Sequence, residues 1–89
     1  MDAESAKELL GQRYEEYNEQ QIAIKTNYDT LIAMAKENYD SLSEEEKAQV
    51  DETEKRLKSA MDEELRINKE KYDANLHSML YLFLILIHP

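Results

Sequence analysis

The sequence predicts an all-α fold: an antiparallel hairpin of two long helices with hendecad (eleven-residue) coiled-coil packing. Three observations predict it. From Asn18 to Tyr72 the chain divides into consecutive units of eleven residues, glycine and proline occur once each, and one unit contains a helix-start signal. Since nearly every other residue type is acceptable inside a helix, long helices are the expected secondary structure.

The eleven-residue units are NEQQIAIKTNY, DTLIAMAKENY, DSLSEEEKAQV, DETEKRLKSAM and DEELRINKEKY. Their eighth column is always lysine, and their first column is aspartate after the opening asparagine. Eleven residues fit three α-helical turns at about 3.67 residues per turn, so each column keeps nearly the same angular position along a helix. From Tyr17 to Leu42 the apolar stripe occupies the third, fourth, seventh and last columns, and it is thinner in the later units. These columns span about 100° of the circumference, the width of a core-facing stripe.

The first helix is expected at about residues 3–40. Asp2 or Ser5 can cap its N-terminus, and Glu4 suits the positive end of the helix dipole. Gly11 costs about 1 kcal/mol relative to alanine, which a long helix tolerates. The residues of this helix that are expected to form the interface are Tyr17, Ile24, Tyr28, Leu31, Ile32, Ala35 and Tyr39.

The third unit contains two conflicting signals. Ser43 followed by Glu46 is a capping-box pattern, which predicts a turn at about residues 40–43 and a new helix after it. The lysine and aspartate columns instead continue through this unit without a phase shift, as they would in one continuous helix. We prefer the hairpin, because each tyrosine ring can then face a small or aliphatic residue. One long continuous helix in a coiled-coil oligomer is the alternative.

The position of the turn also predicts which residues lie opposite one another. A hairpin folded about Leu42 places residue n near residue 84 minus n, since 84 is twice 42. This register brings Tyr28 close to Leu57 and Tyr17 close to Ile67, which are aromatic–aliphatic pairs.

The second helix is expected at about residues 44–76. Pairs such as Glu52–Arg56 and Glu54–Lys58 have the acid four residues before the base, the order that adds about 0.2–0.5 kcal/mol per pair to helix stability. The expected interface residues of this helix are Val50, Leu57, Met61, Leu65, Tyr72 and Leu76.

Residues 76–89 are expected to form an apolar tail, in which Met79 and Phe83 continue the interface stripe. The run Met79–Ile87 is entirely apolar, and as a helix it is only about 14 Å long against a hydrocarbon core of about 30 Å. Such a segment is too short to span a membrane. It therefore needs to be covered by a partner, by self-association or by partial insertion into a lipid surface.

The charge and the cysteine content limit the partners and the compartment. The formal net charge of −9 disfavours nucleic acid and anionic membrane surfaces, because both are negatively charged. The absence of cysteine fits a reducing compartment, and the charged N-terminus does not resemble a secretory signal. We therefore expect a cytoplasmic location.

The residues that carry catalysis or bind metals are scarce. The two histidines, His77 and His88, lie in or beside the apolar tail without the Glu-x-x-His spacing of a carboxylate-bridged metal site. The sequence also has no glycine-rich phosphate-binding loop. We expect no enzyme activity, no catalytic, cofactor-binding or metal-binding residues, and no cofactor.

Together these features predict a non-enzymatic α-helical module for protein–protein interaction or structural support. It would associate through its Tyr/Leu/Ile stripe with itself, as a dimer or four-helix bundle, or with another helical protein. The alternative is a peripheral protein of a membrane or lipid surface, anchored by Leu76–Ile87. The acidic polar face makes the lipid alternative the less favoured one.

Overall fold

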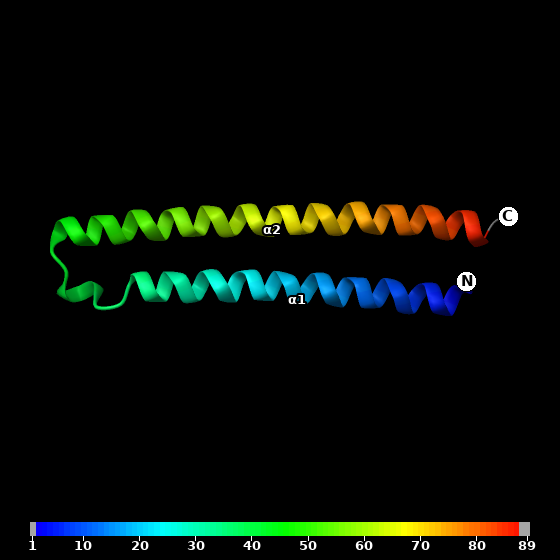
Figure 1. Ribbon diagram of the computed structural model, residues 1–89, viewed down its shortest axis with the longest axis horizontal. Coiled ribbons are helices and arrows are strands. Elements are labelled where there is room, and N and C mark those ends of the chain that lie inside the picture. The colour runs from blue at the N-terminus through cyan, green and yellow to red at the C-terminus, as the bar shows by residue number, and fades with distance from the viewer. Residues whose placement is uncertain (1, 88–89) are drawn as a thin grey trace.

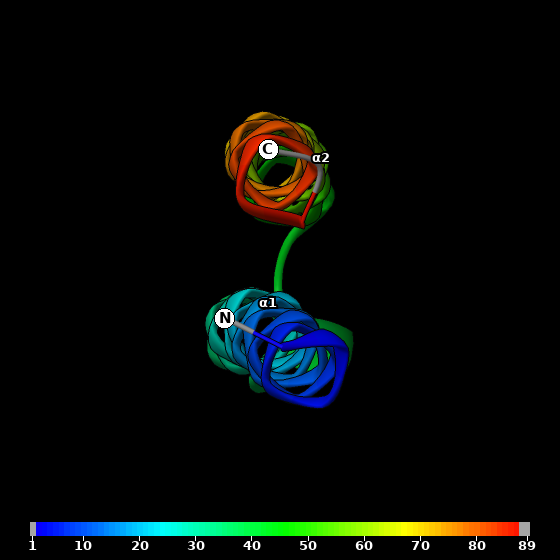
Figure 2. The ribbon, with the colours of Figure 1, turned by 90° about the vertical axis from the view of Figure 1, so that its right-hand side faces the viewer.

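The structure is a computed structural model that describes residues 2–87, and it contains two long helices that lie side by side in opposite directions (Figure 1). Helix α1 comprises Ala3–Ala35, the short 3₁₀ helix η1 comprises Tyr39–Ser41, and helix α2 comprises Glu44–Ile87. The Cα atoms extend over 69 × 17 × 8 Å, a single layer of helices, as the end-on view shows (Figure 2). The predicted all-α hairpin is confirmed, and the alternative of one continuous helix is wrong.

Helix α1 begins with the predicted cap and ends earlier than predicted. The Asp2 carboxylate accepts a hydrogen bond of 2.7 Å from the backbone N–H of Ser5, so Asp2 is the N-cap. The helix was expected to reach about residue 40, but it ends at Ala35. The cause is Asn38, which has a φ of 60° in the left-handed region, where the chain leaves the α-helix.

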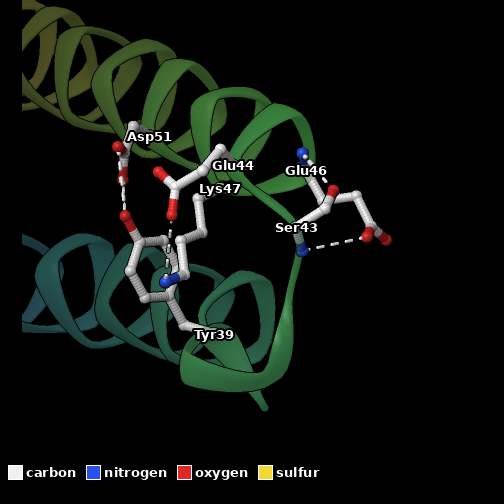
Figure 3. Close-up of polar contacts among 6 residues, drawn as sticks. All are labelled: Tyr39, Ser43, Glu44, Glu46, Lys47 and Asp51. Atoms are coloured by element: carbon white, nitrogen blue, oxygen red, sulfur yellow. Dashed lines mark hydrogen bonds and ion pairs between the residues drawn. The ribbon is translucent and has the colours of Figure 1, made fainter.

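The predicted capping box starts α2. The Ser43 N–H donates to the Glu46 carboxylate over 3.1 Å, and the Glu46 N–H donates to the Ser43 hydroxyl oxygen over 3.2 Å (Figure 3). Tyr39 of η1 holds the turn against α2, because its hydroxyl donates a hydrogen bond of 3.0 Å to Asp51 of that helix. The Lys47 ammonium lies 5.6 Å from the centroid of the Tyr39 ring. These contacts reverse the chain at residues 42–43.

The register of the hairpin differs from the expected one. Gln21 bonds to Asn68 and Tyr17 stacks on Tyr72, so the numbers of opposite residues add up to 89, not 84. The reason is the segment 36–43, which continues outward beyond the end of α1 before α2 starts at Glu44 (Figure 1), so the midpoint of the hairpin lies between residues 44 and 45 and not at Leu42. The tip of the hairpin lies farther out as a result, and α2 needs more residues to return to the same level.

Helix α2 continues to Ile87, beyond the expected end at about residue 76, so the apolar segment is the end of this helix and not a separate tail. Ala6 and Phe83 are the buried hydrophobic residues of the described chain, at 7% and 9% exposure. Their numbers also add up to 89, which places the first turns of α1 against this segment. Across residues 2–87, neither helix combines the length and the apolar character that crossing a membrane requires.

Candidate interaction surface

The predicted interface residues lie along the least exposed sides of α1 and α2, except Tyr39, which lies in η1. All of them except Leu31, which is 46% exposed, are partly or fully buried. The partly or fully buried ones are Tyr17, Ile24, Tyr28, Ile32, Ala35, Tyr39, Val50, Leu57, Met61, Leu65, Tyr72, Leu76, Met79 and Phe83. We call the contact between the two helices, formed by these residues, the seam.

The seam also contains polar residues that the sequence prediction did not include. The Asn68 side-chain amide donates to the Gln21 side-chain oxygen over 2.8 Å, and the Gln21 amide donates to the Tyr17 hydroxyl over 3.1 Å. Glu54 is partly buried as well. These residues occupy the fourth and seventh columns, so their column position, and not their residue type, was the signal that could have identified them.

Three tyrosines join the two helices at the middle of the seam. The rings of Tyr17 and Tyr72 are stacked, with centroids 4.4 Å apart and an interplanar angle of 18°. Tyr14 lies 6.3 Å from both rings and meets Tyr72 edge-on at 68°. Aromatic pairs of this kind contribute about 0.5–1.5 kcal/mol each beyond the area that they bury. This cluster therefore links α1 to α2 through one stacked and one edge-on aromatic contact.

Two other tyrosines bond to acids of the opposite helix or across the turn. The Tyr28 hydroxyl donates to Glu64 over 2.9 Å, as the Tyr39 hydroxyl does to Asp51. A carboxylate acceptor favours the protonated phenol. These hydrogen bonds therefore raise the pKa of Tyr28 and the pKa of Tyr39 above the ordinary tyrosine value.

An ion-pair network lies at the end of α1. The Glu54 carboxylate lies 2.9 Å from the Lys58 ammonium and 3.0 Å from the Lys36 ammonium, and its side chain is only 17% exposed. The hydrogen bond from Lys58, followed by that from Lys36, holds the pKa of Glu54 below its ordinary value. Two members of the lysine column thus reach the same carboxylate.

Two open grooves adjoin each other on one side of the hairpin. The larger has a volume of about 530 Å³ and is lined by Tyr17, Tyr72 and Met79, among others. The smaller, about 200 Å³, is lined by residues that include Ile24 and Ile67. Asn68 and Lys71 line both grooves, so the two form one continuous depression along the seam.

The C-terminal end of α2 is apolar around its whole circumference. Between residues 80 and 86, the side chains other than the buried Phe83 are 44–63% exposed. They are Leu80, Tyr81, Leu82, Leu84, Ile85 and Leu86. Monomeric soluble proteins rarely expose so continuous an apolar patch.

Among residues 2–87, no group of His, Asp and Glu side chains is placed to hold a metal ion. His77 is exposed on α2, and His88 lies outside the described residues. The pKa shifts of the described tyrosines and acids arise from hydrogen bonds and ion pairs with separate partners, and they do not converge on one centre. In comparison with known proteins, no protein family, no curated protein and no solved structure matches this chain.

Proposed function

We propose that the chain is a non-enzymatic helical interaction module in which two hairpins associate into a four-helix bundle. The observation that carries this proposal is the exposed surface. The hairpin has a solvent-accessible surface of 6996 Å². A compact protein of 10.5 kDa has about 5,400 Å². The excess of about 1,600 Å² is surface that a compact fold of this size would have buried.

The size of this excess fits a second copy of the same chain. Two hairpins that each covered about 1,600 Å² would bury about 3,200 Å² together, within the range of about 2,000–5,000 Å² of obligate homodimers. The radius of gyration supports the same view, since it is 20.2 Å against about 12 Å for a compact domain of this length. A single layer of two helices has no core that is closed on all sides.

The proposed packing within the bundle follows the eleven-residue pattern. The last column is represented by Val50, Met61 and Tyr72 in α2, all partly buried, and by the buried Phe83. A stripe that returns to the same angle every eleven residues favours straight or slightly right-handed packing over the left-handed heptad supercoil. The long faces of two such hairpins can therefore align over many turns.

Sedimentation equilibrium tests the proposal. We expect a dimer at micromolar concentrations, both for the full chain and for a variant with Leu84→Gln and Ile85→Gln, because these two side chains lie outside the seam. Circular dichroism of both proteins checks that they stay helical. A dissociation constant of about 100 µM corresponds to an association free energy of only about −5.5 kcal/mol. A wild-type chain that remains monomeric up to this concentration would therefore contradict self-association.

The exposed C-terminal end of α2 favours a second candidate function, namely attachment to a lipid surface. Such a surface would be zwitterionic or neutral, because the net charge of −9 is repelled by anionic lipids. Flotation with phosphatidylcholine vesicles separates the two proposals. Vesicle binding that is lost in the Leu84→Gln/Ile85→Gln variant supports attachment, whereas recovery of the wild type only in the lipid-free fraction excludes it.

A further inference from the structure

We infer that the second copy docks on one defined side of the hairpin, the side with the two grooves, in a symmetric face-to-face contact. This inference rests on the proposed self-association and adds the surface that carries it. We call this side the groove face. It is formed by the third and tenth columns of the repeat, represented on the helices by Gln20, Asn27, Leu31, Ala60, Glu64 and Lys71.

The opposite side is the lysine face, formed by the first and eighth columns. It is represented by Lys25, Asp29, Lys58, Asp62, Lys69 and Asp73. Each residue of the repeat advances about 98° around the helix. Measured from the last column, the third column lies about 65° and the tenth about 98° to one side. The eighth and first columns lie at the same two angles on the other side. Each helix therefore has one flank of each kind.

The antiparallel arrangement places equivalent flanks of the two helices on the same side of the molecule. An antiparallel pair has an approximate two-fold axis perpendicular to its layer, and rotation about that axis keeps every column on its own face. Observed contacts agree with this geometry. Lys36 and Lys58, both from the eighth column, reach Glu54 together, and Gln20 of α1 lines the larger groove with Asn75 and Leu82 of α2.

The two faces differ sharply in charge. Between residues 16 and 82, the helical positions of the third and tenth columns carry charge only at Glu16, Glu64 and Lys71, and Glu16 is paired with Arg13 at 3.1 Å. On the lysine face nearly every position is Lys or Asp. A two-fold contact presses a patch against its own copy, and interface cores are poor in charged residues because desolvating charge is costly. Of these two faces, the groove face meets this requirement.

Docking on the groove face also accounts for Leu31. This residue belongs to the predicted apolar stripe, but the hairpin alone leaves it 46% exposed. It lies in the third column, beside the partly buried Ile24 and Ala35. The depression between the helices, with Tyr17 and Tyr72 in its lining, provides the concave surface into which the side chains of a second copy can pack.

Two matched charge variants test the assignment of the face. The groove-face variant combines Gln20→Glu, Asn27→Asp and Gln49→Glu. The lysine-face variant combines Asn18→Asp, Lys25→Gln and Lys69→Gln. All six positions are exposed helical residues outside the seam. Each variant adds three negative units, so the formal charge changes from −9 to −12 in both.

We expect the groove-face variant to raise the dimer dissociation constant at least about tenfold, because six added charges meet in the symmetric contact. High salt should restore part of the affinity. The lysine-face variant should stay within about threefold of the wild type, and circular dichroism checks that both remain helical. Equal weakening of both variants, or stronger weakening by the lysine-face variant, overturns the assignment while self-association stands. A monomeric wild type overturns both the assignment and the proposed function.

Maleimide labelling gives a second readout that does not depend on added charge. The chain has no cysteine, so Gln20→Cys and Lys25→Cys each introduce a single thiol. Raising the protein concentration through the dimerisation range should slow labelling at position 20 and leave the rate at position 25 unchanged. Protection at position 25 alone, or at neither position in a proven dimer, rejects the groove face as the contact.

Discussion

Replacing Tyr72 tests the contact that joins the two helices most directly. Its ring stacks on Tyr17 at 4.4 Å and meets Tyr14 edge-on at 6.3 Å. The two aromatic contacts contribute about 1–3 kcal/mol together. Removal of an aromatic side chain from a closed core costs about 3–5 kcal/mol, and Tyr72 is only partly buried. We therefore expect Tyr72→Ala to lower the free energy of unfolding by about 2–4 kcal/mol.

This loss is a large share of the whole stability. A chain of 89 residues is stable by about 4–13 kcal/mol at 0.05–0.15 kcal/mol per residue. Tyr72→Leu should cost less, about 1–2 kcal/mol, because leucine keeps much of the apolar contact and loses only the aromatic geometry. Urea denaturation followed by circular dichroism, at one fixed protein concentration, measures both values.

A double-mutant cycle isolates the Tyr17–Tyr72 pair. With Tyr17→Leu and Tyr72→Leu, we expect a coupling energy of about 0.5–1.5 kcal/mol. The cycle between Tyr28→Leu and Tyr72→Leu is the control, and it should be additive within about 0.5 kcal/mol because these rings have different partners. A Tyr17–Tyr72 coupling below about 0.3 kcal/mol would refute the stacked geometry and with it the register.

Two further predictions concern the turn and the start of α2. Asn38→Ala should lower the free energy of unfolding by about 1 kcal/mol, because alanine is strained at a φ of 60°, whereas Asn38→Gly should be neutral or stabilising; urea denaturation measures both. Ser43→Ala should cost about 1 kcal/mol by removing half of the capping box. The hydrogen bond from the Ser43 backbone lowers the pKa of Glu46, so the contribution of this carboxylate is complete above its ordinary pKa of 4.5 and is lost as the pH falls through the folded-state value. The stability difference between the wild type and Glu46→Ala should therefore shrink on acidification, and a difference that grows would contradict the capping role.

The features that depend on local signals could be predicted from the sequence. The cap at Asp2, the capping box of Ser43 with Glu46, and the stripe of mostly half-buried residues all follow from residue type and spacing, and the structure contains each of them, with Leu31 the exposed member of the stripe. The antiparallel direction followed from the turn, since two adjacent helices joined by a short connection pack against each other.

The register and the polar seam could not be predicted in the same way. Asn38 is acceptable within a helix and in the left-handed region, so the sequence did not show that α1 ends at Ala35. The turn geometry then shifted every opposite pair by about five residues. Gln21 and Asn68 satisfy each other only in the actual register, so neither residue alone indicated a seam position.

The end of α2 shows a further limit of reading a pattern from composition. From Met79 onwards every residue up to Ile87 is apolar, which hides the stripe that marks the buried side elsewhere. The column position still identified Phe83, which is eleven residues after Tyr72 and is the buried residue of this segment. Which exposed side of the hairpin takes a partner depends on charge placement around both helices, and this placement is defined only once their relative direction is known.

The most direct test of the hairpin and its register is a pair of distances measured by electron spin resonance. Spin labels are attached to cysteines introduced at positions 25 and 58 in one protein and at 25 and 69 in another, all exposed members of the lysine column. Dilution with unlabelled chain removes distances between copies. Residue 64 lies opposite residue 25, so positions 58 and 69 are offset from it by about 9 Å and 7.5 Å along the axis.

We therefore expect two nearly equal distances, within about 3 Å of each other. In the register in which residue n faces 84 minus n, the offsets would be about 1.5 Å and 15 Å, and with helices about 10 Å apart the two distances would differ by about 8 Å. One continuous helix would give about 50 Å and 66 Å. A difference of about 8 Å would contradict the register described above, and distances of about 50 Å and 66 Å would contradict the hairpin itself.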